Sequence, residues 1–341
     1  MRKYNVAIAG ATGAVGEELC RVLEDLDFPV GELFPLASAK SVGLDVEYKG
    51  KNYKVRELTQ TVFDECEIDI AFFSAGGSVS AKFAPFAAEA GAVVIDNTSH
   101  FRMDSDVPLV VPECNPADIA QWKNKGIIAN PNCSTIQMVQ VLKPLDDVFD
   151  IKRVDVSTYQ AVSGAGKEGM TELVNQMQDF FAFKLDESKV EKFQHRIALN
   201  VIPHIDVFGD NDYTKEEMKM VNETQKILHK DMEVSATCVR VPILRSHSEA
   251  ITVHFANAVD ANRARDILKN APSIVVVDEP SKNEYPMPII STDMDETYVG
   301  RIRQDIYRDN VLHLWCCADQ IRVGAATNAV RIALKWIELE E

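Results

Sequence analysis

The feature that most constrains the fold lies near the N-terminus, where a short apolar run meets a glycine-rich loop. Residues 4–10, YNVAIAG, have the composition of a buried strand, and Gly10, Gly13 and Gly16 follow in the loop GATGAVG. One helical stripe then carries the apolar residues Val15, Leu19, Val22 and Leu23. Glycines at this spacing allow a tight turn and let a pyrophosphate approach the N–H groups that begin a helix. The segment predicts a dinucleotide-binding βα unit, with an ordinary strand-to-helix turn as the alternative.

Strand-like and helix-like segments alternate through the first part of the chain. The expected strands are residues 32–38, 68–77, 92–99 and 126–132, with a helix at 78–91 and a polar hairpin at 45–58 that turns at Lys49-Gly50-Lys51. This alternation with short connections is typical of an α/β fold, here a Rossmann-type domain with a parallel, doubly wound sheet.

The pattern changes after about residue 150. A strand at 151–162 alternates so that Val154, Val156, Thr158 and Gln160 share one face. Further helices are expected at 167–183, 215–229 and 324–341, and long strands at 233–248 and 249–259. This mixture predicts a second, mixed α+β domain for catalysis and dimerisation. We expect residues 1–132, completed by a C-terminal helix at 321–341, to form the cofactor domain, and residues 133–320 to form the second domain.

The acidic composition argues against several classes of function. The chain has 36 Lys and Arg against 52 Asp and Glu, a formal net charge of -16, whereas nucleic-acid binding requires a basic surface. No run approaches the roughly 18 apolar residues of a membrane span, and no signal-peptide core precedes the first strand. The seven cysteines contain no C-x-x-C pair, so we expect no disulfide or metal site but reduced thiols in a cytoplasmic protein.

The end of the second predicted strand bears on which cofactor binds. Rossmann domains that prefer NAD usually carry Asp or Glu there, about 20 residues after the glycine loop, for the ribose hydroxyls. This chain instead has Ser38, Ala39, Lys40 and Ser41, with no carboxylate to repel a 2′-phosphate. NADP is therefore the predicted cofactor, although Lys40 alone could be an ordinary surface lysine.

The segment NPNCSTIQ, residues 130–137, places Cys133 between a strand and a predicted helix. The partial positive charge at a helix N-terminus favours a thiolate. Backbone N–H groups there, or the Asn132 side chain, could stabilise an oxyanion. Cys133 is thus a candidate nucleophile, and a buried structural cysteine is the alternative.

A thiol nucleophile needs an acid/base partner, which is most often histidine. The chain has seven histidines, and His247 lies in a polar break within RVPILRSHSEAI, close to Arg240 and Arg245. From the residues alone this places His247 only slightly ahead of the other six, because a lone histidine is more often structural.

Six motifs occur in order along the chain: GATGAVG, NPNCSTIQ, STYQAVSGAG, EEMKM, CVRVPILRSHSE and GAATNAV. Together they resemble the aspartate-semialdehyde dehydrogenase family over nearly the whole length. The resemblance implies that Cys133 attacks the acyl phosphate of 4-phospho-L-aspartate, that phosphate leaves, and that NADPH reduces the thioester to L-aspartate 4-semialdehyde. It also implies a role in the synthesis of lysine, threonine and methionine, by way of diaminopimelate for lysine, and a homodimer or homotetramer.

The resemblance assigns a role to individual residues. It implies that His247 is the general acid/base and that Gln160 orients the substrate and the thioester. Arg240 would bind the substrate's α-carboxylate through its planar fork, and Glu216 would meet its ammonium group. Arg102 and Lys219 would hold the phosphate. The residues expected at the cofactor are Gly10, Thr12, Gly13, Ala14, Val15, Lys40, Ser41, Ser163, Gly164 and Gln320.

The spacing of two assigned residues imposes a condition on the fold. Arg240 and His247 are seven positions apart, so a straight strand would direct their side chains to opposite faces. Pro242 between them makes a bend or bulge plausible, and without one the two roles would conflict.

Glu216 and Lys219 are three positions apart on a predicted helix, so one helical face can present both. A surface ion pair is the alternative interpretation of that spacing.

Three other functions remain to be weighed against this one. N-acetyl-γ-glutamyl-phosphate reductase performs a similar reduction, but its substrate nitrogen is neutral, so a carboxylate such as Glu216 would have no ammonium to bind. Glyceraldehyde-3-phosphate dehydrogenase shares the thiol chemistry and resembles the chain much less. A non-catalytic dinucleotide-binding homologue is disfavoured because Cys133, Gln160, Arg240 and His247 occur together.

Overall fold

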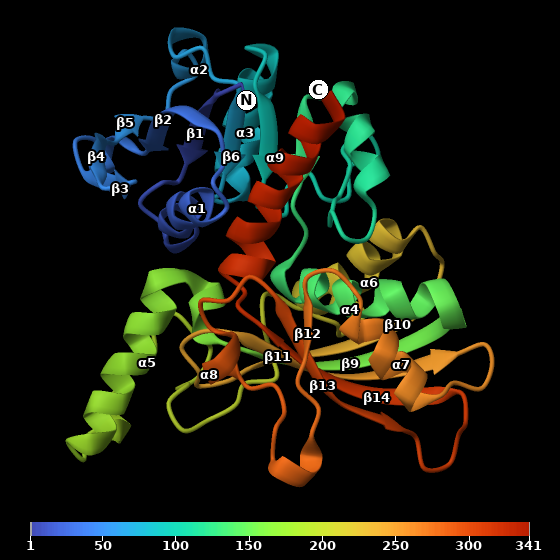
Figure 1. Ribbon diagram of the computed structural model, residues 1–341. Coiled ribbons are helices and arrows are strands. Elements are labelled where there is room, and N and C mark those ends of the chain that lie inside the picture. The colour runs from blue at the N-terminus through green and yellow to red at the C-terminus, as the bar shows by residue number, and fades with distance from the viewer. Residues whose placement is uncertain (1, 341) are drawn as a thin grey trace. The chain divides into compact units, whose positions relative to one another are not determined.

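The computed structural model describes residues 2–340, and the chain forms two compact units (Figure 1). Unit 1 runs to Asn132 and resumes at Gly324, and unit 2 is Cys133–Val323. Within residues 2–340, no helix combines the length and the apolar character needed to span a bilayer.

Unit 1 contains a six-stranded sheet in the order β5-β2-β1-β6-β7-β8, and every pairing in it is parallel. Its strands are β1 (Tyr4–Ala9), β2 (Val30–Ala37), β5 (Arg56–Glu57), β6 (Ile70–Phe73), β7 (Val93–Asp96) and β8 (Ile127–Ala129). The helices of this unit are α1 (Ala14–Asp25), α2 (Val62–Glu65), α3 (Gly77–Glu89) and α9 (Thr327–Glu340), with 3-10 segments at Ala39–Ser41 and Pro116–Asn124. The predicted parallel, doubly wound sheet is confirmed. The predicted hairpin is also present, as β3 (Asp45–Tyr48) paired with β4 (Lys51–Lys54).

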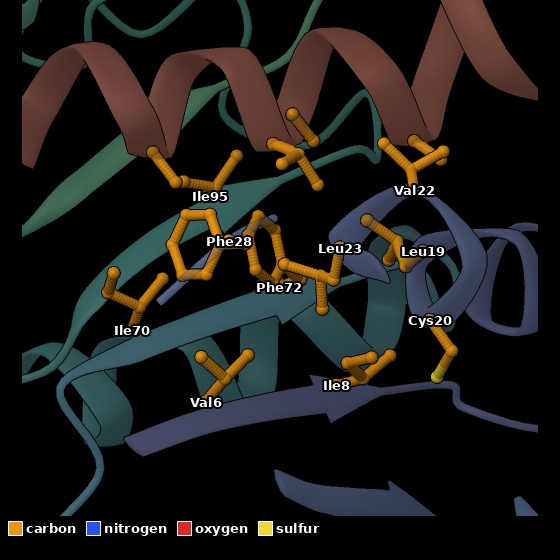
Figure 2. Packing of buried hydrophobic residues seen from close by; sticks show 14 of the residues in the cluster. Val6, Ile8, Leu19, Cys20, Val22, Leu23, Phe28, Ile70, Phe72 and Ile95 are labelled. Atoms are coloured by element: carbon orange, nitrogen blue, oxygen red, sulfur yellow. The ribbon is translucent and has the colours of Figure 1, made fainter. Parts of the chain in front are cut away.

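The core of unit 1 lies between its sheet, α1 and α9. The stripe predicted on α1 is buried at Leu19, Val22 and Leu23, which pack with strand residues such as Ile8 and Phe72 (Figure 2). Ala329, Val330, Ile332, Ala333 and Ile337 of α9 belong to the same cluster. The last helix of the chain therefore completes the core that the first residues begin.

Unit 2 is built on a mixed sheet in the order β10-β9-β11-β14-β13-β12. Its strands are β9 (Ile151–Gln160), β10 (Glu233–Arg240), β11 (His247–Phe255), β12 (Ile274–Val276), β13 (Thr297–Gln304) and β14 (Val311–Ala318). Its helices are α4 (Cys133–Phe149), α5 (Gly166–Phe181), α6 (Lys215–Leu228), α7 (Ala261–Lys269) and α8 (Pro288–Ser291), with 3-10 turns at Val162–Ala165, Leu185–Glu187 and Pro280–Lys282 and a π-helical turn at Arg322–Ala326. Helices α4, α6 and α7 pack on one face of the sheet through an apolar cluster (Figure 1).

The prediction of one continuous strand over residues 233–248 is wrong. β10 ends at Arg240 and β11 begins at His247, and β9 lies between these two strands in the sheet. Pro242 has no N–H to donate to a ladder, and Ser246 adopts a left-handed conformation with φ of 73°. The segment between them therefore turns, and the condition set by the spacing of Arg240 and His247 is met.

Candidate active site

The glycine loop begins where β1 ends, at the carboxyl edge of the parallel sheet. Gly10 has φ of 94°, and a Cβ there would lie 3.0 Å from the Ala75 nitrogen. A Cβ at Gly16 would lie 2.2 Å from the Gly10 carbonyl oxygen, so a larger residue cannot be accommodated without movement. The loop therefore requires glycine for its own geometry, and it brings backbone close to the start of α1.

A cavity of about 560 Å³ opens beside this loop. The predicted cofactor residues among those lining it are Gly10, Thr12, Gly13 and Ser41. Ala14 and Val15 begin α1, and Lys40 is exposed between two lining residues, Ala39 and Ser41. A tight glycine turn at the edge of a parallel sheet, with a helix start and a cavity beside it, fits a dinucleotide.

The same cavity is lined by a carboxylate that the sequence analysis missed. Glu57 of β5 pairs with Ala37 at the end of β2, so it lies beside Ser38 although it is distant in sequence. The position after the second strand carries no acid, as expected, but the neighbouring strand supplies one. A motif search limited to residues 38–41 could not find it.

Cys133 is the first residue of α4, as predicted. It is half-buried, whereas the other six cysteines are buried, and none of the seven forms a disulfide. Across residues 2–340, no group of three or more His, Cys, Asp or Glu side chains is arranged to hold a metal ion. The position thus combines partial access with a helix N-terminus, which suits a nucleophilic thiol.

Gln160, at the end of β9, is held by two hydrogen bonds. The Thr158 hydroxyl donates to the Gln160 side-chain oxygen at 2.9 Å, and the Gln160 amide nitrogen donates to Glu216 at 3.1 Å. Burial is at least nine-tenths for all three residues. The prediction that Thr158 and Gln160 share one face of the strand is confirmed. The two hydrogen bonds fix the orientation of the Gln160 side-chain amide.

Glu216 and Lys219 lie near the start of α6, which begins with a reciprocal pair of hydrogen bonds. The Thr214 side chain accepts from the Glu217 N–H, and the Glu217 carboxylate accepts from the Thr214 N–H. Lys219 pairs with Glu216 at 3.0 Å and with Asp206 at 2.9 Å. Burial pushes the pKa of Lys219 down, but the two carboxylates outweigh it and raise that pKa to about 12.

Arg240 and His247 are held together by one backbone residue, Ala161. The Ala161 N–H donates to the His247 Nδ1 atom at 3.0 Å, and the Ala161 carbonyl accepts from the Arg240 Nη1 atom at 2.6 Å. His247 is fully buried and Arg240 is 7% exposed. Burial first, and the Arg240 charge second, lower the pKa of His247 to about 3. Burial also lowers the pKa of Arg240, while the negative charges of Glu216 and Cys133 act in the opposite direction.

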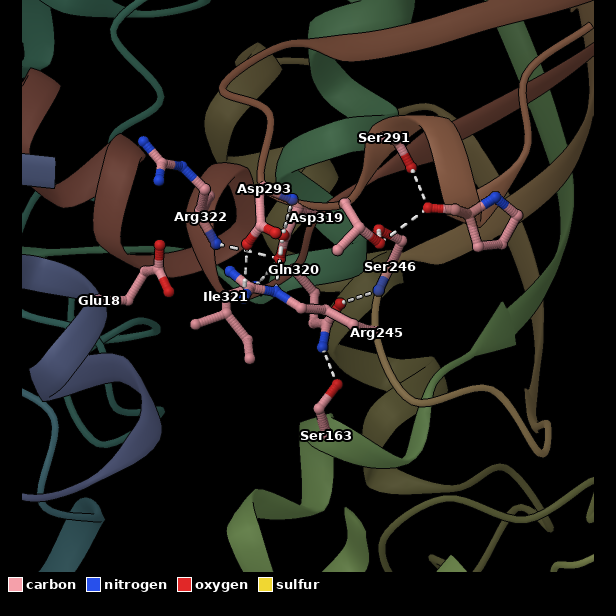
Figure 3. A network of polar contacts seen from close by, with 12 residues as sticks. Glu18, Ser163, Arg245, Ser246, Ser291, Asp293, Asp319, Gln320, Ile321 and Arg322 are labelled. Atoms are coloured by element: carbon pink, nitrogen blue, oxygen red, sulfur yellow. Dashed lines mark hydrogen bonds and ion pairs between the residues drawn. The ribbon is translucent and has the colours of Figure 1, made fainter. Parts of the chain in front are cut away.

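A second polar group joins residues predicted at the cofactor. Gln320 donates to the Ser163 hydroxyl and accepts from the Ser246 N–H at 2.8 Å (Figure 3). Arg245, next to Ser246, pairs with Asp293 at 2.8 Å and with Asp319 at 2.7 Å. Gly164 follows Ser163, and a Cβ there would lie 3.0 Å from the Arg240 Nη1 atom. The turn at 162–165 therefore lies against Arg240 and is joined through Gln320 to Ser246, the residue that precedes His247.

The remaining predicted substrate residues belong to unit 1. Arg102 is 7% exposed, and its guanidinium donates to the carbonyl oxygens of Asn97 and Asn130 at 2.8 and 2.9 Å. Asn132 is buried and directly precedes Cys133. The Arg102 side chain is therefore positioned by the backbone that follows the strands β7 and β8.

Two family descriptions match the chain. Residues 5–122 match the semialdehyde dehydrogenase NAD binding domain, and residues 142–323 match the semialdehyde dehydrogenase dimerisation domain. The aspartate-semialdehyde dehydrogenase of Campylobacter jejuni is 72% identical over 339 residues, which cover 99% of each chain.

Solved structures give the same relationship. The structure of aspartate semialdehyde dehydrogenase II from Vibrio cholerae complexed with ASA has a TM-score of 0.96 at 48% identity and covers 99% of each chain. The structure of aspartate semialdehyde dehydrogenase with NADP from Candida albicans has a TM-score of 0.76 at 26% identity, again over 99% of each chain.

Proposed function

Because this chain belongs to the aspartate-semialdehyde dehydrogenase family, we propose that it reduces 4-phospho-L-aspartate to L-aspartate 4-semialdehyde through a thioester on Cys133. The observation that carries the proposal is the clamp at Ala161, which holds His247 and Arg240 side by side. Arg240 and Cys133 interact through their charges, which supports the proposal that the two residues held by Ala161 act on the Cys133 thiol.

We propose that Arg240 binds the substrate's α-carboxylate. A buried guanidinium with one nitrogen already bound to a carbonyl is fixed in plane, so its remaining edge can meet a carboxylate in a fork. Glu216 is the partner for the substrate's ammonium, and its existing bond to the Lys219 ammonium supports this role. The same pairing disfavours an N-acylated substrate, whose neutral nitrogen could not satisfy a buried carboxylate.

We propose that the phosphate is held mainly by Arg102. Lys219 can bind phosphate only by giving up Asp206 or Glu216, since both carboxylates already pair with it. Gln160 orients the acyl group through its amide, which Thr158 and Glu216 fix. Asn132, which precedes the nucleophile, is proposed to assist at the acyl oxygen.

NADP is the cofactor we propose, and when bound in reduced form it supplies the hydride that reduces the thioester. The absence of an acid at residues 38–41 and the nearby Lys40 support NADP, as does the Candida albicans relative, whose structure is one with NADP. Glu57 acts in the other direction because a carboxylate repels a 2′-phosphate. We therefore propose that the preference for NADP over NAD depends on the balance between attraction of the 2′-phosphate by Lys40 and its repulsion by Glu57.

We propose a homodimer that forms through unit 2, which carries the family's dimerisation domain. The face of its sheet opposite α4 exposes Tyr159, whose ring packs against Trp315 at 5.3 Å between centroids. Trp315 also lines an apolar hollow with Pro286 and Met287. We also propose that the protein is cytoplasmic and that it binds small molecules rather than nucleic acid or a membrane.

An assay in the reverse direction tests the function. With L-aspartate 4-semialdehyde and NADP, absorbance of NADPH should appear only after phosphate or arsenate is added, because the thioester must be released by that anion. N-acetyl-glutamate 5-semialdehyde should give no signal under the same conditions. Activity with the acetylated substrate alone, or turnover without an added anion, would refute the proposal.

A further inference from the structure

Phe193, in the segment between α5 and α6, lies against the guanidinium of Arg240. The guanidinium carbon is 5.9 Å from the centroid of the Phe193 ring, within the ~6 Å at which an aromatic face attracts a cation. Phe193 is half-buried, and Arg240 is 7% exposed. Because such an attraction is stronger where water is excluded, the ring is placed to restrain the charged group.

Gln176 of α5 holds both ends of the segment that carries Phe193. Its side-chain oxygen accepts the N–H groups of Ile197 and Ala198, each at 3.0 Å, and its amide nitrogen donates to the Lys189 carbonyl at 2.9 Å. Gln176 is 1% exposed, so losing these contacts would leave buried polar groups unpaired. The segment therefore begins and ends on one buried side chain.

Glu172 lies one helical turn before Gln176 and holds the middle of the same segment. Its Oε2 atom accepts the N–H groups of Glu191 and Lys192 at 3.0 and 2.5 Å, and its Oε1 atom accepts from the Gln176 amide at 3.1 Å. Hydrogen bonds to a carboxylate are among the stronger ones. Phe193 directly follows this pair of contacts, which limits where its ring can lie.

The chain that leaves this segment then pairs with the backbone of Arg240. The Ile202 N–H donates to the Arg240 carbonyl at 2.9 Å, and the Arg240 N–H donates to the Ile202 carbonyl at 2.8 Å. Phe193 packs against an apolar cluster that includes Val162, Leu173 and Ile202. A movement of this stretch would therefore reach Arg240 through both its backbone and its side chain.

Gly169 of α5 allows the ring to approach the helix closely. A Cβ at Gly169 would lie 3.1 Å from the Phe193 Cζ atom, which is tighter than ordinary packing. The tip of the ring is thus packed against the α5 backbone, while its face lies under the Arg240 guanidinium.

We propose that Phe193 is a positioning residue for the substrate's α-carboxylate, because its ring fixes the orientation of the Arg240 guanidinium. Gln176 and Glu172 hold Phe193 in place. The inference rests on the proposed function, in which Arg240 binds that carboxylate. The Ala161 carbonyl holds one edge of the guanidinium, and the ring restrains its face. The remaining edge is then presented in the orientation that a bidentate contact requires.

Steady-state kinetics of Phe193→Leu test this role, because leucine keeps an apolar side chain and removes the aromatic face. In the reverse assay we expect KM for L-aspartate 4-semialdehyde to rise about 3–10-fold, with kcat within about twofold and the KM values for phosphate and NADP unchanged. Phe193→Tyr keeps the face and should retain the wild-type KM. A wild-type KM in the leucine variant, equal increases in all three KM values, or a tyrosine variant as weak as the leucine one would overturn the proposal.

A double-mutant cycle with Arg240→Lys separates positioning from simple packing. Lysine lacks the plane that the ring orients, so adding Phe193→Leu to this variant should raise KM by less than about twofold further. If Phe193 only supports the packing of its segment, the full cost seen in the wild-type background would appear again, and the inference would fail.

Gln176→Leu tests the attachment of the segment to α5. We expect amide hydrogen exchange at Ile197 and Ala198 to become at least about tenfold faster, and KM for the semialdehyde to rise as in Phe193→Leu. Glu172→Gln weakens the same attachment without an apolar substitution and should show both effects to a smaller degree. Exchange that stays slow, or faster exchange with an unchanged KM, would contradict the role given to these two side chains.

The wild-type assay separates failure of the proposed function from failure of this inference. A wild type that forms no NADPH on addition of phosphate refutes the function, whatever the variants do. An active wild type with an unchanged KM in Phe193→Leu refutes the positioning role alone.

Discussion

Thr158 and Gln160 lie two positions apart on β9, and the Thr158 hydroxyl donates a 2.9 Å hydrogen bond to the Gln160 side-chain oxygen. That oxygen is thereby the acceptor end of the amide, so the nitrogen faces Glu216. An amide nitrogen carries two N–H groups, and the second is oriented by the same two contacts. With Gln160 proposed to orient the acyl group, Thr158 is proposed to act on the substrate through Gln160, without a contact of its own.

Replacing Thr158 with valine removes the hydroxyl and keeps a side chain of similar size. The Gln160 amide can then rotate by a half-turn, so we expect kcat/KM to fall roughly tenfold, the worth of one hydrogen bond of ordinary strength. Steady-state kinetics measure this, and Thr158→Ser serves as the matched control because it restores the donor. If the valine and serine variants matched in kcat/KM, the orienting role would be excluded.

The common face of Thr158 and Gln160 was predictable, because strand periodicity depends on local sequence alone. The hydrogen bond from the Gln160 amide to Glu216 was not predictable, since α6 brings Glu216 to β9 from a distant part of the sequence. The apolar run VPIL favoured one long strand, whereas Pro242 and the left-handed Ser246 end it. In this case one residue without an N–H, Pro242, and one positive φ, at Ser246, outweighed the apolar character of Val241, Ile243 and Leu244.

Backbone contacts were invisible to sequence analysis for a different reason. The atoms of Ala161 that hold His247 and Arg240 are present in every residue, so no side-chain pattern marks them. Glu57 was missed because parallel pairing of β5 with β2 brings it beside the cofactor cavity from 20 residues beyond Ala37. Sequence motifs can identify candidate side chains, but strand register and turn geometry determine which of those side chains are in contact.

Cys133→Ala removes the proposed nucleophile and little else, because the position is half-buried at a helix start. We expect turnover to fall below detection while NADPH binding, followed by its fluorescence, is unchanged. Cys20→Ala is a suitable control: it is a buried cysteine of the unit 1 core, and its loss should cost stability but leave turnover measurable. Wild-type rates in Cys133→Ala would exclude a thioester.

Arg240→Lys keeps the charge and loses the planar fork. A lysine can reach the Ala161 carbonyl or the substrate's carboxylate but cannot hold both in one plane. We expect KM for the substrate to rise about 10–100-fold, as for the loss of a charge-assisted hydrogen bond of about 1.5–3 kcal/mol, and cofactor affinity to stay within about twofold. Equal weakening of substrate and cofactor, measured by kinetics and titration, would instead indicate misfolding.

Gly164→Ala tests the close packing of the turn at 162–165 against Arg240 and His247. Its Cβ would press against the Arg240 Nη1 atom at 3.0 Å and approach the His247 Nε2 atom at 3.6 Å, so the Arg240 side chain must shift. We expect a loss of about 10²-fold in kcat/KM for a displacement of this size, with little change in the melting temperature. Gly209→Ala, in an exposed loop, is the control and should retain activity.

Glu249 is a fully buried carboxyl group on β11, two residues after His247. Its Oε2 atom accepts from the Cys316 thiol at 3.6 Å, and Gln137 of α4 donates to the same sulfur at 3.7 Å. Within the described chain its Oε1 atom has no hydrogen-bond partner. Burial raises the pKa of Glu249 from its ordinary value of 4.5 to about 8, although the contacts with Cys316 and Gln137 act against burial.

This raised pKa makes the stability of the fold depend on pH. Between pH 4.5 and 8 the folded chain keeps the Glu249 proton and the unfolded chain loses it, so the stability that this group contributes falls as pH rises. Glu249→Gln is neutral at every pH and of equal size. Its free energy of unfolding should match that of the wild type near pH 4.5 and exceed it increasingly up to pH 8, by an amount on the order of 5 kcal/mol at full effect. Urea unfolding at several pH values measures the difference, and a difference that stays constant with pH would show that Glu249 is ionised in the folded protein.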